Sequence, residues 1–305
     1  MASGVVESPC TAASEVSKLL EYARQTPGFD FLDSSLAIRD GERGRGVFAT
    51  VAIAKGTPLI TIPSALAVRP LDAMAQRIAS GECSRLLALV LTVVHGIHFR
   101  CEENPFFALL QTSPPPDCPL LWEEAQLRYL EGTSLLQQAD GSGAAASKAA
   151  ASAREAFHGV VLPLMKQIGE ALLPSSVQTQ RAFATALSWV ASRAVLGRVA
   201  YEYGSACLWP YLKADGPQTD TRLVLLPVFD LLNTSSDPSA LCARLSQAAG
   251  GGGHGGAGEA GEAGWMVTAT RDIAPGDEIL LSYGAHGPAE LLRTYGILEG
   301  SPDMA

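Results

Sequence analysis

The chain has 305 residues, of which 47% are hydrophobic and 17% are charged, and its formal net charge is −9. This length and apolar content are enough to bury a core, and they exclude an intrinsically disordered chain. An acidic chain without a basic stripe argues against nucleic acid or an anionic membrane as its main partner.

The first part of the chain is predicted to form one helix and then short strands. Residues 17–24 have the pattern of a short amphipathic helix, which stops at Pro27 and Gly28. Short apolar runs broken by glycine then predict strands at residues 36–38, 46–49 and 58–63. The turn at residues 40–46 carries three glycines, a residue used where φ is positive or where a ligand lies against the backbone.

The middle of the chain, residues 70–203, is predicted to be mostly helical. Apolar residues recur at helical spacing in residues 84–99, 122–130, 151–173 and 179–196. A Ser-Pro-Pro-Pro run from Ser113 predicts an extended break, and a low-complexity connector starts at Asp140. His95 and His98 are three positions apart on one of these helices. No further ligands are evident near them, so no metal site is predicted.

Strand character returns in the last part of the chain, at residues 221–229, 265–270 and 278–282. Residues 250–264 are almost entirely Gly, Ala and Glu, which predicts a flexible surface loop. The loop lacks the Gly-Lys-Ser/Thr ending that a phosphate-binding loop needs. Strands on both sides of a long helical stretch indicate one α+β domain that is interrupted in the middle.

The cysteines show no Cys-x-x-Cys pair. They are Cys10, Cys83, Cys101, Cys118, Cys207 and Cys242. This scatter is typical of reduced, mostly buried thiols in an intracellular protein rather than of a disulfide framework or a zinc site. The longest apolar stretch, residues 86–94, is too short to cross a bilayer, and residues 1–28 show no secretory signal.

Four segments, taken in order, resemble one family. They are Arg-Gly-Arg-Gly-Val-Phe-Ala from Arg43, Ser-Trp-Val-Ala-Ser-Arg from Ser188, Leu-Pro-Val-Phe-Asp-Leu-Leu-Asn from Leu226, and residues 271–296 with Ser-Tyr-Gly at 282–284. Each motif alone is common, but four in this order and spacing are specific. The chain therefore resembles the SET-domain methyltransferases of the Rubisco large-subunit lysine methyltransferase class, over roughly residues 15–298.

The resemblance implies an α+β fold. This fold has a SET-domain β-core of short strands, a long helical insertion and a knot-like C-terminal segment. The domain plan that follows is an N-terminal helical lead at 1–30, the SET domain at 31–297 with its insertion at about 70–203 and its flexible loop at 250–264, and a short tail at 298–305.

The resemblance also implies S-adenosylmethionine as the cofactor. Arg193 matches the arginine that grips the cofactor's carboxylate, and a guanidinium suits this role because it presents paired donors to a planar acceptor. Asn233 matches the asparagine whose amide binds the amino-acid end. The other cofactor-binding residues implied are Gly44, Arg45, Gly46, Asp230, Thr234 and Tyr283. Without the family, the alternative for Arg193 is a structural ion pair, with Asp230 as a candidate partner. Asn233 would then cap a turn, and the glycines would form a plain hairpin turn.

By the same resemblance, Tyr283 is the catalytic tyrosine, where the cofactor meets the substrate channel. Ser192 and Tyr295 match positions that line the channel for the acceptor side chain. The alternative interpretations are a core tyrosine at the end of a strand for Tyr283, a helix hydroxyl bonded to its own backbone for Ser192, and an ordinary packed aromatic for Tyr295.

The implied reaction is methyl transfer to an amine of a non-histone protein, with lysine as the favoured acceptor and histidine still open. Lysine must first lose a proton, which costs roughly 5 kcal/mol at pH 7. An apolar channel lowers this cost by disfavouring the ammonium form. No Gly-x-Ser-x-Gly or His-Glu-x-x-His motif supports a hydrolase.

The alternative is a SET-like binding or scaffold module that has lost catalysis. Two departures motivate it. Many relatives have histidine where this chain has Thr234, and the chain ends at Ala305, where relatives continue into a helical substrate-binding lobe. Recognition of an unidentified protein substrate then falls to the helical insertion or to an accessory partner. Retention of Arg193, Asn233 and Tyr283 argues for the enzyme. The expected compartment is the cytoplasm, with the chloroplast and the nucleus as alternatives.

Overall fold

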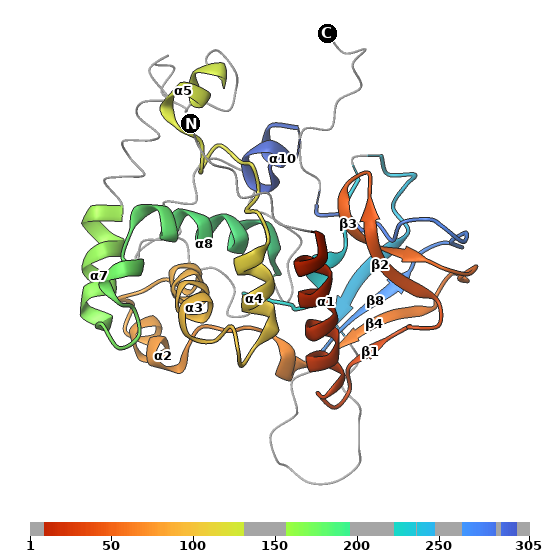
Figure 1. Cartoon of the computed structure of the whole chain (residues 1–305), viewed down its shortest axis with the longest axis horizontal. Helices are drawn as coiled ribbons and strands as arrows, with labels where there is room; N and C mark the ends of the chain where they lie inside the picture. The colour runs from red at the N-terminus through yellow and green to blue at the C-terminus, as the bar shows by residue number, and fades with distance from the viewer. Residues whose placement is uncertain are drawn as a thin grey trace. The chain divides into compact units, whose positions relative to one another are not determined.

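The computed structural model describes residues 9–130, 157–195, 223–235, 237–247, 264–284 and 288–297. The chain divides into two compact units. The first combines Met1–Val68 with Leu226–Ala285, and the second combines Arg69–Leu225 with His286–Ala305. The first unit carries most of the strands and the second most of the helices, so the predicted mixture of α and β structure is confirmed (Figure 1).

The first unit is built on a four-stranded antiparallel sheet. Its strand order is β1 (Asp30–Phe31), β4 (Pro58–Ile62), β8 (Trp265–Ala269) and β7 (Ala243–Gln247), as Figure 1 shows for β1, β4 and β8. Burial alternates along β8, with Trp265, Val267 and Ala269 buried. This period of two is what a sheet with one face on a core requires. Helix α1 (Pro9–Arg24) belongs to the same unit.

A hairpin of β2 (Leu36–Gly41) and β3 (Gly44–Ala49) completes the strands of the first unit. The strands pair from Leu36↔Ala49 to Gly41↔Gly44, which leaves Glu42 and Arg43 as the loop. Gly44 has a φ of +84°, a conformation that favours glycine at a tight turn. The expected turn is therefore shorter than residues 40–46, and β3 already includes Gly46.

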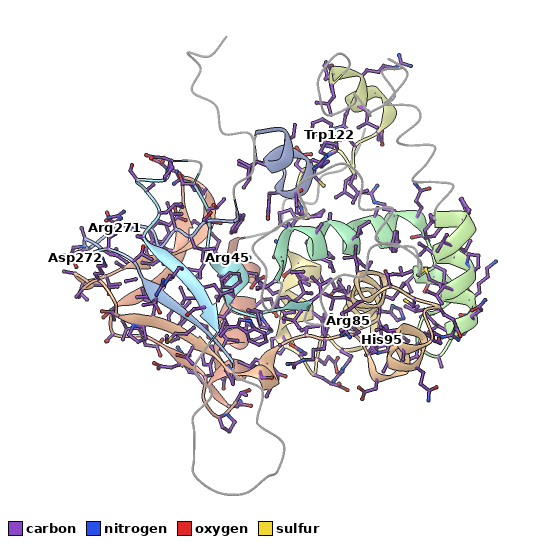
Figure 2. The ribbon with its side chains drawn as sticks, turned by 180° about the vertical axis from the view of Figure 1, so that it is seen from behind. Arg45, Arg85, His95, Trp122, Arg271 and Asp272 are labelled. Carbon is purple, nitrogen blue, oxygen red and sulfur yellow. The ribbon has the colours of Figure 1, made fainter. Side chains whose placement is uncertain are left out.

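The segment from Ile273 to Tyr283 interleaves with the rest of the first unit. Glu278 bridges Phe48 of β3, while Leu280 and Leu281 bridge Asn233 and Ala243. Just before this segment, Arg271 and Asp272, labelled in Figure 2, anchor the turn after β8. The Arg271 guanidinium donates to the carbonyls of Ala240 and Leu241, both at 3.3 Å. This interleaving is the knot-like C-terminal segment that the SET resemblance implies.

The second unit is a set of packed helices. They are α2 (Asp72–Ala79), α3 (Arg85–Phe99), α4 (Pro105–Thr112), α5 (Glu124–Leu127), α7 (Leu162–Ile168), α8 (Gln180–Arg193) and α10 (Pro288–Tyr295). Residues 86–94 of α3 are all buried, and α8 lies alongside α3 (Figure 1). Ser84 and Thr179 cap the N-termini of α3 and α8 with their side chains, as residues of this type commonly do.

Several expected boundaries were wrong, for local reasons. The helix expected at 151–173 ends at Ile168, because Gly169 adopts a φ of +94°. The helix expected at 179–196 ends at Arg193, where β5 (Ala194–Val195) pairs with β6 (Val224–Leu225). The helix expected from 122 begins at Glu124.

The strands expected at 221–229 and 278–282 are also shorter. The first keeps only β6 among its described residues, because the chain turns after Pro227, and the second consists of isolated bridges. The connector from Asp140 and most of the predicted loop at 250–264 lie outside the described residues. Within the part of the chain that the structure describes, no helix is both long and apolar enough to span a bilayer.

Candidate functional site

The residues proposed from sequence fall into two sets, one in each unit. The first unit holds Gly44, Arg45, Gly46, Asp230, Asn233, Thr234 and Tyr283, and the second holds Ser192, Arg193 and Tyr295. Arg45, labelled in Figure 2, lies on β3. Four members of the first set, Arg45, Asn233, Thr234 and Tyr283, take part in hydrogen bonds between β3, residues 232–234 and the interleaved C-terminal segment.

Asn233 is the centre of the first set. Its Nδ2 donates to the Arg45 carbonyl at 3.1 Å and to Glu278 Oε1 at 2.7 Å. Its backbone carbonyl accepts from Leu281 N–H at 3.1 Å. A side-chain amide has two N–H groups, so both are used here and the oxygen Oδ1 is left as the acceptor. Asn233 is thus held by long-range contacts and does not merely cap a local turn.

Tyr283 is anchored at both ends to the segment that carries Asn233. Its hydroxyl donates to the Leu232 carbonyl at 2.7 Å, and its backbone N–H donates to Thr234 Oγ1 at 3.4 Å. Thr234 is buried, with 6% of its surface exposed. The residue that stands where many relatives have histidine therefore has a defined structural contact with the backbone of Tyr283.

Asp230 lies in a short 3-10 helix, η5 (Phe229–Leu231), which packs against β3. The residue before this helix, Val228, is fully buried and has a φ of +73°. A β-branched residue in this region is a true outlier, with a strain of about 1–3 kcal/mol. The turn that brings Asp230 towards β3 is therefore held by the packing around Val228.

The three residues at 44–46 have different roles in the structure. Gly44 serves the hairpin turn, and a side chain there would meet no atom within 4 Å, although its positive φ would be strained. Gly46 lies inside β3, where a Cβ would overlap Glu278 Oε1 and lie 2.9 Å from Asn233 Nδ2. The hairpin-turn alternative thus fits Gly44, whereas Gly46 makes room for two side chains.

In the second unit, Ser192 and Arg193 are joined to each other. The Ser192 hydroxyl donates to the Ser188 carbonyl at 2.9 Å and accepts from Arg193 Nη1 at 3.0 Å. The alternative of a hydroxyl bonded to its own helix is therefore what the structure has, with the added contact to the guanidinium. Tyr295 ends α10, which packs on α8, and Gly296 follows with a φ of +69° and lies close to the Asp117 backbone.

The sequence analysis did not predict two further residues that lie at the site in the first unit. Glu278 has a side chain that is only 8% exposed, and it contacts Asn233 and Arg43. Cys242 accepts from Leu280 N–H at 3.3 Å and lies 3.5 Å from the Glu278 carbonyl. Burial raises the pKa of the Cys242 thiol. Glu278 lies within residues 271–296, one of the four segments that carry the family resemblance, but nothing in its spacing indicates a buried carboxylate.

The histidines of α3 have structural contacts. His95, labelled in Figure 2, places its Nδ1 2.9 Å from the Leu172 carbonyl, and both His95 and His98 pack on Phe99. Among the described residues, no group of three or more His, Cys, Asp or Glu side chains could hold a metal ion.

The chain matches the profile of one known protein family. The profile of the SET domain matches residues 44–284, from the glycine of the hairpin to the glycine that follows Tyr283. The chain belongs to the SET-domain family. The matched range begins at Gly44 and ends one residue after Tyr283, so the family's own boundaries enclose the hydrogen-bonded site.

The most similar relatives include lysine methyltransferases of about twice this length. N-lysine methyltransferase SETD6 of Mus musculus is 22% identical over 268 residues, which cover 85% of this chain and 49% of the relative. The Xenopus laevis relative of the same name is 23% identical, covering 84% of this chain and 51% of the relative. This SET-domain chain spans about half the length of the curated relatives it matches.

Solved structures of the same fold include those of Rubisco LSMT. The LSMT SET domain bound to lysine and AdoHcy has a TM-score of 0.67 and 20% identity, covering 96% of this chain and 58% of the other. Rubisco LSMT bound to AdoMet has a TM-score of 0.63 and 18% identity, covering 96% of this chain and 57% of the other. These likenesses show that the chain has the SET fold.

Proposed function

We propose that the chain is an S-adenosylmethionine-dependent methyltransferase that acts on the lysine side chain of a non-histone protein. The observation that carries the proposal is the Tyr283 hydroxyl bond to the Leu232 carbonyl, one residue away from the held amide of Asn233. Membership of the SET family, together with relatives named as N-lysine methyltransferases, supports the cofactor and the acceptor.

Each unit carries one residue whose chemistry suits the amino-acid end of S-adenosylmethionine. Asn233 Oδ1 remains as an acceptor for an α-ammonium group, since both N–H groups of the amide are used. The Arg193 guanidinium suits the α-carboxylate, because it presents paired donors to a planar acceptor. When bound, the cofactor supplies an electrophilic methyl group on a sulfonium.

Tyr283 is suited to bind the amine that receives the methyl group. Its hydroxyl proton goes to the Leu232 carbonyl, so towards any further group the phenolic oxygen acts as an acceptor. An acceptor can hold an amine N–H or a polarised methyl C–H group. An amine that donates an N–H group to the phenolic oxygen keeps its nitrogen lone pair, which can then attack the methyl group.

The first test is calorimetric titration with S-adenosylmethionine. We expect micromolar binding to the wild-type chain and binding at least about 10-fold weaker for Arg193→Ala, since a hydrogen bond to a charged group contributes about 1.5–3 kcal/mol. Arg181→Ala is the matched control, because Arg181 lies on the same helix and is exposed. If the wild-type chain is folded but does not bind S-adenosylmethionine, the proposal that this molecule is the cofactor is refuted.

The second test is transfer of a labelled methyl group to an array of lysine-centred peptides. We expect incorporation that depends on Tyr283 and is absent when the lysine is replaced by arginine. Binding of the cofactor without transfer to any peptide or to an extract would favour the binding-module alternative. Transfer to histidine-centred peptides alone would show that the acceptor is histidine and not lysine.

A further inference from the structure

Glu278 is a buried carboxylate whose position is fixed by its backbone. It bridges Phe48 of β3, and the neighbouring Ile279 N–H donates to the Val47 carbonyl at 2.7 Å. On the other side, the Cys242 thiol contacts the Glu278 carbonyl. The side chain is 8% exposed, so its charge must be matched by hydrogen-bonding partners.

The partners of the carboxylate lie on both sides of it. Oε1 accepts from Asn233 Nδ2 at 2.7 Å, the length of a charge-assisted bond, and Oε2 lies 3.4 Å from Arg43 Nη1. The second proton of the Asn233 amide goes to the Arg45 carbonyl. If the amide were rotated by 180°, Oδ1 would face a carboxylate and a carbonyl. Glu278 and Arg45 together therefore allow only one orientation of the amide.

Gly46 gives independent support for a built contact. A Cβ on Gly46 would overlap Glu278 Oε1 and lie 2.9 Å from Asn233 Nδ2. Its φ is not among the positive values, so the backbone conformation does not demand glycine at this position. The missing side chain is explained by the space that the Glu278–Asn233 pair occupies.

We infer that Glu278 is a positioning residue, which holds the Asn233 amide so that its oxygen is offered to the α-ammonium of the cofactor, and that Gly46 provides the space for this contact. The inference rests on the proposed function, because it assigns the ammonium to Asn233. It also makes a claim about the ligand-free protein, in which the amide is already oriented. Such preorganisation lowers the cost of binding.

The first experiment examines the amide without any ligand. The Asn233 side-chain N–H signals are assigned in the NMR spectrum by their loss in Asn233→Asp. In the wild-type chain we expect them to be shifted from those of solvated asparagines and protected from hydrogen exchange. In Glu278→Ala this protection should be lost, whereas Glu278→Gln, which keeps an acceptor oxygen, should retain it. Solvent-like Asn233 signals in the wild-type chain would overturn the inference.

The second experiment measures the affinity for S-adenosylmethionine by calorimetry. We expect Glu278→Ala to bind about 10-fold more weakly and Glu278→Gln to bind within about 3-fold of wild type. Glu42→Ala, which removes an exposed carboxylate from the hairpin loop, is the control for net charge. A Glu278→Ala variant with wild-type affinity would overturn the inference. So would a Glu278→Gln variant as weak as Glu278→Ala, because the effect would then come from charge.

A double-mutant cycle with Gly46 completes the test. Gly46→Ala alone should also weaken binding by about 10-fold, because its methyl group displaces the pair. In Glu278→Ala the same methyl group enters vacated space, so Gly46→Ala/Glu278→Ala should bind no more weakly than Glu278→Ala. Additive losses would overturn the shared-space claim. If Glu278→Ala fails to fold, Gly46→Ala carries the test, and wild-type affinity there overturns the inference.

The two proposals can fail separately. If the wild-type chain binds the cofactor and the Glu278 variants bind equally well, the proposed function stands and the inference falls. If the Asn233 amide is protected in the ligand-free chain but the wild-type chain does not bind S-adenosylmethionine, the proposed function falls. In that case the role of Glu278 towards a cofactor falls with it.

Discussion

Tyr283 and Leu232 show how a single hydrogen bond can set the direction of a hydroxyl group. A tyrosine hydroxyl is both a donor and an acceptor, and the 2.7 Å bond to the Leu232 carbonyl commits its proton. The remaining acceptor character is what an amine or a polarised methyl group needs. The role of the residue thus depends on a backbone carbonyl that no side-chain motif reveals.

Tyr283→Phe is expected to lose catalysis and keep cofactor binding. Removal of one polar group at a reacting centre costs about 10²–10³-fold in kcat, and the ring itself stays in place. The measurement is single-turnover methyl transfer beside a calorimetric titration. Tyr129→Phe is the matched control, because Tyr129 is 86% exposed. Wild-type kcat in Tyr283→Phe would contradict the assigned role.

Thr234→Val should destabilise the chain, whereas Thr234→Ser should not. Valine has the shape of threonine but cannot accept the Tyr283 N–H bond, and the loss of one hydrogen bond costs about 0.5–1.5 kcal/mol. We expect a lower free energy of unfolding in urea and a few-fold lower kcat for the valine variant. Equal stability of the two variants would show that the hydroxyl contact is unimportant.

At the scale of elements, helix α3 meets α4 at a glycine. Gly96 lies on α3, and a Cβ there would overlap the ring of Phe107 on α4. Phe107 is 3% exposed and packs against Phe106, so the ring has little room to move. A helix-weakening residue is tolerated in the interior of α3 because it allows this close approach.

Gly96→Ala is therefore expected to lower the free energy of unfolding by about 1–3 kcal/mol, despite the higher helix propensity of alanine. Thermal and urea denaturation measure the change. Gly159→Ala is the control, since a Cβ there meets no atom within 4 Å. In the Gly96→Ala background, Phe107→Leu should recover part of the lost free energy of unfolding. If the double variant is as unstable as Gly96→Ala alone, the strain does not come from the Phe107 ring.

Prediction of the elements from sequence depended on local signals. The helices around α3 and α8 were found because apolar periodicity is clear there, and the structure adds a Ser or Thr side-chain cap at each N-terminus. Helices α2 and α4 lie within the stretch that was predicted to be mostly helical, but they are short and their bounds were not predicted. Strand β7 was missed, because it is defined by pairing with β8 rather than by its own pattern. Short elements take their structure from neighbours, which composition does not reveal.

For the whole molecule, the buried thiols predict a loss of stability at alkaline pH. Burial raises the pKa of Cys83 from 9.0 to about 12, and it also raises the pKa of Cys118 and of Cys242. Below pH 9 both the folded and the unfolded chain keep the Cys83 proton. Above pH 9 the unfolded chain releases it first, so the free energy of unfolding falls with rising pH by about 1.4 kcal/mol per unit for this thiol.

The measurement compares wild type with Cys83→Ala in urea titrations from pH 7.5 to 10.5 under reducing conditions. The stability difference between the two chains should be constant up to about pH 9 and change above it, because only the wild type carries the titrating group. As the pH rises above 9, the free energy of unfolding should fall faster for the wild type than for Cys83→Ala. A difference that stays constant across the whole range would contradict the burial of a neutral Cys83 thiol.

The sequence by itself determined the family and the mixed fold, and it predicted most of the residues at the candidate site, because these are written in ordered local motifs. It could not show which of those residues touch. The bonds that define the site join Arg45 to Asn233 over 188 positions, Leu232 to Tyr283 over 51 and Asn233 to Glu278 over 45. Only the tertiary structure decided these contacts, because hydrogen bonds depend on distance in space, and the fold brings groups that are remote in the sequence within 3.1 Å of each other.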